Sequence, residues 1–130
     1  MKNNYVADTM AIILRLENRK LSQKVKNIFD ESEAGQIKIF IPTMVLAEIG
    51  YLSERNKIDT TLKEVNNYCK KYPTIMPQSI SDKIISKSFE IDDIPELHDR
   101  IIAGTAFYKG LELITNDRII IASQFISTVW

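Results

Sequence analysis

Four acidic residues stand at positions where a carboxylate is expected to do chemistry. Asp8 and Asp117 each follow shortly after an apolar run, whereas Glu48 and Asp99 belong to stretches in which apolar residues recur at helical spacing. A carboxylate among apolar neighbours is costly to desolvate, and four gathered in one place repel one another and raise each other's pKa. A divalent cation removes both costs, so the pattern predicts a metal site.

Ligands that are all oxygen favour Mg²⁺ or Mn²⁺ over zinc. A hard cation of this kind suits hydrolysis of a phosphodiester, because it activates water, polarises the phosphate and stabilises the leaving oxygen. Each acid also has a plainer explanation. Asp8 and Asp117 fit helix N-caps, Asp99 fits a partner of a helix dipole, and Glu48 fits a solvated or salt-bridged helix residue.

The elements that would position these acids alternate between strand and helix. Strands are expected at 5–7, 37–41, 112–115 and 126–130, with a short edge strand at 72–76 that contains Pro73 and ends before Pro77. Helices are expected at 10–16, 21–36, 43–56, from an N-cap at Asp59 through 71, and at 79–91, 97–109 and 117–124. This alternation predicts a three-layer α/β/α fold around a parallel sheet of four to five strands, with the site at the carboxyl ends of the strands.

Length and composition agree with one domain spanning residues 1–130. The chain is 45% hydrophobic and 26% charged, and its 17 basic and 17 acidic residues cancel, which excludes a large global basic field but not a local one. One cysteine, Cys69, and one histidine, His98, are too few for a structural zinc site, and the single thiol favours a reducing compartment. With no stretch long enough for a secretory signal or a membrane span, we expect a cytoplasmic protein.

The four acidic blocks together resemble the PIN-domain family, and more particularly its VapC-type toxin ribonucleases. The blocks are Tyr5-Val6-Ala7-Asp8-Thr9, Val45-Leu46-Ala47-Glu48-Ile49, His98-Asp99-Arg100-Ile101-Ile102-Ala103-Gly104-Thr105-Ala106 and Leu113-Ile114-Thr115-Asn116-Asp117-Arg118. The Asp-Arg-Ile-Ile-Ala block combined with Thr-Asn-Asp is the specific part of the resemblance. Two features depart from the family pattern: Met10 stands where a small polar residue is common, and the chain after Asp117 is short.

The resemblance implies a metal-dependent endoribonuclease, usually a homodimer, that is the toxin of a type II pair and is blocked by a cognate antitoxin. It implies that RNA phosphodiesters are hydrolysed by metal-activated water, with Mg²⁺ or Mn²⁺ held by the catalytic acids Asp8, Glu48, Asp99 and Asp117. Thr9 and Thr115 would support these acids through their hydroxyls, and Asn116 would lie beside them.

Three arginines are candidates for binding RNA phosphates. Arg100 and Arg118 directly follow two of the acids, and Arg15 belongs to a small basic group with Arg19 and Lys20. Balancing of surface charge explains them equally well. His98 is expected to be a local hydrogen-bonding residue and is left out of the catalytic set.

Other functions fit the sequence less well. A non-catalytic PIN-like module that binds metal or RNA, or acts as a scaffold, would be expected to have lost at least one acid. A housekeeping RNA-processing nuclease of the same family stays open. A haloacid-dehalogenase-like phosphatase needs an aspartate where Met10 stands, and no acceptor aspartate of a phosphoacceptor receiver follows a middle strand.

Overall fold

Five short strands rich in Ile and Val form the centre of the protein. In the computed structural model, which describes residues 3–130, all of them run parallel in the order β3-β2-β1-β4-β5. Their bounds are β1 (Tyr5–Ala7), β2 (Ile39–Pro42), β3 (Ile75–Gln78), β4 (Glu112–Ile114) and β5 (Thr128–Val129). Strands buried on both faces are expected to be apolar, and the two central strands next to each other, β1 and β2, contain only apolar residues and Tyr5. The predicted parallel sheet is confirmed, with five strands.

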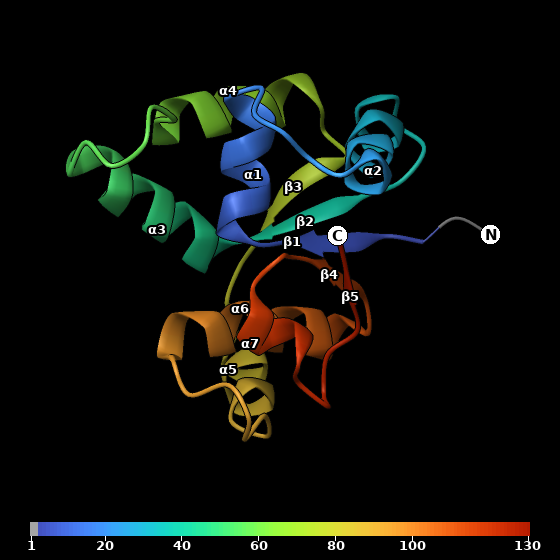
Figure 1. The fold of residues 1–130 in the computed structure, drawn as a ribbon, viewed down its shortest axis with the longest axis vertical. Coiled ribbons are helices and arrows are strands. Elements are labelled where there is room, and N and C mark those ends of the chain that lie inside the picture. Colours follow the sequence, from blue (N-terminus) through green and yellow to red (C-terminus); the bar gives the residue numbers. More distant parts are fainter. Residues whose placement is uncertain (1–2) are drawn as a thin grey trace.

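Helices cover both faces of the sheet, as Figure 1 shows. On one face lie α1 (Thr9–Leu16), α2 (Gln23–Glu33), α3 (Thr43–Glu54) and α4 (Leu62–Lys71). On the other lie α5 (Asp82–Ser88), α6 (Leu97–Lys109) and α7 (Arg118–Ile121). The three-layer α/β/α prediction is therefore confirmed. Among the described helices, none is both long and apolar enough to cross a bilayer.

The predicted N-cap at Asp59 is wrong. Helix α4 begins at Leu62, and Thr61 is its cap, because the Thr61 hydroxyl accepts the Glu64 N–H at 3.1 Å. The Asp59 and Thr60 N–H groups donate instead to Glu17 Oε2, at the end of α1. This tie to α1 holds residues 59–60 outside the helix.

Several other predicted elements are shorter or shifted. Ser22 and Ser81 cap α2 and α5, so both helices begin later than predicted, and α7 covers only Arg118–Ile121 of the predicted 117–124. The edge strand lies at Ile75–Gln78 and includes Pro77, while β2 is shifted to include Pro42. A proline is tolerated in β3 because that strand forms the edge of the sheet.

The sheet order places the two strand-end acids side by side. In the pairing of β1 with β4, Ala7 is opposite Ile114, and the Asp8 N–H donates to the Ile114 carbonyl at 3.1 Å. Helices α3 and α6 come from opposite faces and contact each other at this same edge. All four predicted acids thus come from elements that converge on the carboxyl edge of the sheet.

Candidate active site

The four acids line one cavity of about 250 Å³ at the carboxyl edge of the sheet. Asp8 directly follows β1, Glu48 is in the middle of α3, Asp99 is in the first turn of α6, and Asp117 caps α7. The rest of the lining is Thr9, Met10, Leu52, Ile102, Asn116 and Ile120. The grouping predicted from sequence is therefore present in three dimensions.

Asp8 is the most deeply placed of the four, with only 7% of its surface exposed. It is the N-cap of α1, and its Oδ1 accepts the Ala11 N–H at 2.9 Å. Burial is the main reason that its pKa rises to about 6; hydrogen bonds from Thr115 and Ala11 act against the rise, and the charges of Asp117 and Glu48 add to it. Asp8 is thus fixed in place in an environment that disfavours its ionised form.

Asp99 is half-buried and also has a pKa raised to about 6. Burial is again the largest cause, followed by the charge of Glu96 and then those of Asp117, Glu48 and Asp8. The charges of the other three acids therefore act on Asp99. A positive charge bound among the acids would offset this repulsion.

Thr115 links the two acids that follow the central strands. It is fully buried; its hydroxyl hydrogen-bonds Asp8, and its Oγ1 accepts the Asp117 N–H at 3.1 Å. Asp117 Oδ1 in turn accepts the N–H groups of Ile119 and Ile120 at the start of α7. Asp8 and Asp117 are therefore helix N-caps, as the simpler explanation of each predicted, and they also line the cavity.

Glu48 is held from across the cavity by Thr9. The Thr9 hydroxyl donates to Glu48 Oε1, which joins the first residue of α1 to the middle of α3. Glu48 is half-buried between small and apolar neighbours, as its sequence context predicted. The exposed Asn116 also lines the cavity, beside the acids as expected.

No basic side chain lines this cavity, and over residues 3–130 no Lys, Arg or His forms an ion pair with any of the four acids. Arg15 instead forms ion pairs with Asp30, at 2.7 Å, and with Glu33, at 2.9 Å. Arg100 donates to the Ile94 carbonyl at 2.7 Å and stacks over Phe89, whereas Arg118 is exposed on α7. Of the three arginines, two have structural partners and Arg118 does not line the cavity.

A second group of potential ligands was missed from sequence. Within residues 3–130, Glu48, Glu96 and His98 each offer one potential ligand atom, and these three atoms all lie within 4.8 Å of one another. His98 Nδ1 is 3.1 Å from Glu96 Oε1, which agrees with the local hydrogen-bonding role expected for His98. The sequence signal is slight, because Glu96 and His98 are close in sequence but Glu48 joins them only through the contact of α3 with α6.

The donor set of the cavity fits a hard divalent cation. Carboxylate oxygens come from four elements, hydroxyls orient two of them, and neither histidine nor cysteine lines the cavity. A cation there would lower the raised pKa values of Asp8 and Asp99 by supplying the missing positive charge.

Comparisons with known proteins agree with this architecture. The profile of the PIN domain matches residues 5–124, which is most of the chain. Among curated protein sequences, none matches significantly.

Several solved structures have a similar fold. VapBC2 from Rickettsia felis, solved with a DNA fragment from its promoter, has a TM-score of 0.75 and 18% identity over 97% of this chain and 98% of that one. DNA-bound VapBC from Salmonella typhimurium has a TM-score of 0.72 and 18% identity over 98% of each chain. VapC20 from Mycobacterium tuberculosis, a toxin that cleaves the sarcin–ricin loop, has a TM-score of 0.66 and 13% identity over 95% of this chain and 97% of that one. At these identities the likeness concerns the fold.

Proposed function

The chain belongs to the PIN-domain family, and from that premise we propose that it is a Mg²⁺- or Mn²⁺-dependent endoribonuclease, the toxin of a type II toxin–antitoxin pair. The observation that carries the proposal is the cavity lined by Asp8, Glu48, Asp99 and Asp117, with which no basic side chain of residues 3–130 forms an ion pair. Such a group of acids is unfavourable on its own and becomes favourable when it binds a cation.

In this proposal the four acids are the catalytic, metal-binding residues. A bound cation would supply water activation and neutralisation of the phosphate charge. The protein's own contribution is to hold the carboxylates still: helix N-termini fix Asp8 and Asp117, and the hydroxyls of Thr115 and Thr9 fix Asp8 and Glu48. Without the cation, the same charges would repel an RNA phosphate, so substrate binding is expected to depend on the metal.

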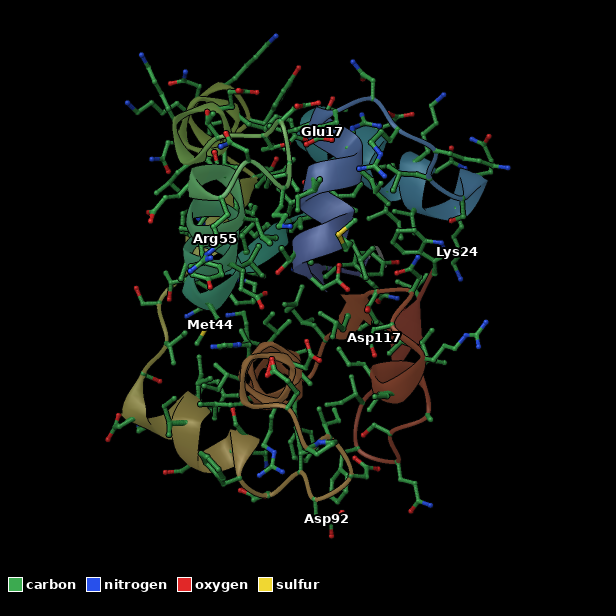
Figure 2. The ribbon with its side chains drawn as sticks, turned by 60° about the vertical axis from the view of Figure 1, so that its left-hand side comes forward. Glu17, Lys24, Met44, Arg55, Asp92 and Asp117 are labelled. Atoms are coloured by element: carbon green, nitrogen blue, oxygen red, sulfur yellow. The ribbon has the colours of Figure 1, made fainter. Side chains whose placement is uncertain are left out.

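A cleavage assay tests the proposal. End-labelled single-stranded and structured RNAs are incubated with the wild type, Asp8→Asn and Asp92→Asn, with Mg²⁺, Mn²⁺ or EDTA. Asp92 is an exposed acid in the loop after α5, far from Asp117 in Figure 2, and is the matched control. We expect cleavage by the wild type and by Asp92→Asn with either metal, products with 5′-phosphate and 3′-hydroxyl ends, and a loss of at least 100-fold in Asp8→Asn. A wild type that binds metal but cleaves none of the RNAs would instead identify a non-catalytic module.

The toxin role rests on the likeness to chains from toxin–antitoxin complexes. We propose an antitoxin protein as partner, a homodimer as the active assembly and the cytoplasm as the compartment. Induced expression should arrest growth, and co-expression of a small neighbouring gene for a DNA-binding protein should restore it. Growth arrest that Asp8→Asn causes as strongly as the wild type would contradict the toxin role, and the absence of arrest would favour a housekeeping RNA-processing nuclease.

A further inference from the structure

A groove of about 510 Å³ adjoins the four-acid cavity, between α3 and the start of α6. It is lined by Met44, Ala47, Glu48, Tyr51, Leu52 and His98. Glu48 and Leu52 also line the four-acid cavity, so the two hollows are adjacent and share these two residues. Figure 2 looks onto this region, with Met44 on α3 and Asp117 at the start of α7 on either side of α6.

The side chains of the groove suit a flat, uncharged ring. Tyr51 is 55% exposed, and His98 offers an imidazole from the opposite element with 54% of its side chain exposed. The guanidinium of Arg55 lies 4.5 Å from the centroid of the Tyr51 ring, which restrains the ring and covers one of its faces. Aromatic side chains that are exposed and restrained in this way are the usual platforms for unstacked nucleobases.

The charges of the groove favour a base over a phosphate. Its carboxylate is Glu48, and Glu96 lies within 4.8 Å of Glu48 and His98, so a phosphate would be repelled unless a cation were present. A neutral base has no such penalty, and a volume of about 510 Å³ lies within the usual range for ligand pockets. Because the groove and the four-acid cavity share Glu48 and Leu52, a base placed in the groove would belong to a nucleotide near the phosphate that is cleaved.

We propose that the groove between α3 and α6 is a nucleobase subsite, in which Tyr51 stacks on an unpaired base of the RNA next to the scissile phosphate. This inference rests on the proposed nuclease function and adds a base-binding residue to the same site. Tyr51 is then a specificity-determining residue rather than a catalytic one.

A double-mutant cycle tests the subsite. The RNA that the wild type cleaves is prepared with one abasic nucleotide at each position around the cleavage point, and kcat/KM is measured for the wild type, Tyr51→Ala, Tyr51→Phe and Tyr108→Ala. Tyr108 is a matched control, since it is 46% exposed on α6 and lines neither hollow. Thermal unfolding checks that each variant is folded.

We expect one abasic position to lower wild-type kcat/KM about 5- to 150-fold, the range of a lost base–aromatic stack. Tyr51→Ala should show a loss of similar size on intact RNA and no further loss at that position, whereas Tyr51→Phe and Tyr108→Ala should behave like the wild type. A 5-iodouridine at the same position should crosslink to Tyr51 on irradiation.

Two outcomes would overturn the subsite alone. The first is that the losses caused by Tyr51→Ala and by the abasic nucleotide are fully additive at every position. The second is an unchanged kcat/KM in Tyr51→Ala together with weaker inhibition by the antitoxin, which would make the groove a protein-docking surface. If the wild type cleaves no RNA with either metal, the nuclease proposal fails and the subsite fails with it.

Discussion

Asp8 combines two roles that conflict in the absence of a cation. It caps α1 and is almost wholly buried. Because its pKa is raised to about 6, its ionisation at neutral pH lowers the stability of the folded protein. Its position after a strand was enough to predict that it lies at the sheet edge. Its bond to Thr115 and the effect of the Asp117 charge on its pKa depend on the pairing of β1 with β4, which the sequence does not specify.

Replacement of Asp8 by asparagine should therefore stabilise the metal-free protein. The unfolded-state pKa is about 3.9 and the folded-state pKa about 6, so wild-type stability is lost as the pH rises between these values and is constant above them. Asparagine can still cap the helix. We expect the unfolding free energy of Asp8→Asn to exceed that of the wild type by about 1–3 kcal/mol at pH 7, and the difference to vanish near pH 4.

Urea unfolding in EDTA at pH 4 and pH 7 measures this difference, and Asp92→Asn is the control. Saturating Mg²⁺ should reduce or reverse it, since only the wild type gains binding energy. A wild type that is more stable than Asp8→Asn at pH 7 in EDTA would contradict the electrostatic account.

Thr115 offers a second test at this scale. Thr115→Val has a similar shape but removes the hydroxyl that bonds Asp8 and accepts the Asp117 N–H. We expect a loss of about 1–3 kcal/mol in stability and weaker binding of Mn²⁺ in a calorimetric titration, with Thr115→Ser close to the wild type. Equal Mn²⁺ affinity in Thr115→Val would show that the hydroxyl does not position the acids.

At the scale of elements, the close packing of α5 against α6 holds the helix that carries Asp99. Gly104 is in contact with Ser88, and a Cβ built on Gly104 would lie 1.9 Å from Ser88 Oγ and 2.8 Å from Ser88 Cα. Because one of these atoms belongs to the backbone, the helices would have to separate. The helix at 97–109 was predicted with the correct bounds, but this need for a glycine was not, since it depends on the neighbouring helix.

Gly104→Ala should therefore destabilise the protein by about 1–3 kcal/mol, the usual cost of overpacking. Gly50→Ala is the matched control, because its Cβ would meet nothing nearer than Leu62 Cδ2 at 3.9 Å, and alanine is favoured within a helix by about 0.5–1 kcal/mol. Chemical denaturation measures both changes. Equal effects of the two substitutions would show that the α5–α6 contact is looser than described.

Element boundaries were the least predictable part of the fold. The end of α2 has a local signal in Gly35, whose φ of +80° favours glycine, although the helix ends at Glu33, three residues before the predicted end at 36. The start of α4 does not have one, because the competing partner of Asp59 and Thr60 is Glu17, about 40 residues away in sequence. Local sequence signals therefore indicate helix ends that depend on neighbouring residues, but they do not indicate a helix end that is set by a contact with a residue distant in sequence.

At the scale of the whole molecule, the alternation of strands and helices was enough to predict the parallel three-layer fold. The sheet order was not predicted, yet it is this order that places β1 beside β4 and brings Asp8 next to Asp117. The groove beside Tyr51 was not predicted either, because it exists only where α3 meets α6.

The neutral overall charge has a consequence for RNA binding. If a cation neutralises the four clustered acids, 13 of the 17 acidic residues are left against 17 basic ones. We therefore expect weak RNA binding by the wild type in EDTA and tighter binding when Ca²⁺ is added, measured by fluorescence anisotropy at about 150 mM salt. Strong binding by the metal-free protein would point to a basic surface away from the cavity.

The most direct test of the account is the single-turnover rate of RNA cleavage as a function of Mn²⁺ concentration, for the wild type, Asp99→Asn and the control Asp92→Asn. We expect a rate that saturates with Mn²⁺ for the wild type and for Asp92→Asn, is abolished by EDTA, and is at least 100-fold lower in Asp99→Asn at every concentration. Cleavage that persists in EDTA, or an Asp99→Asn variant as fast as the wild type, would contradict it.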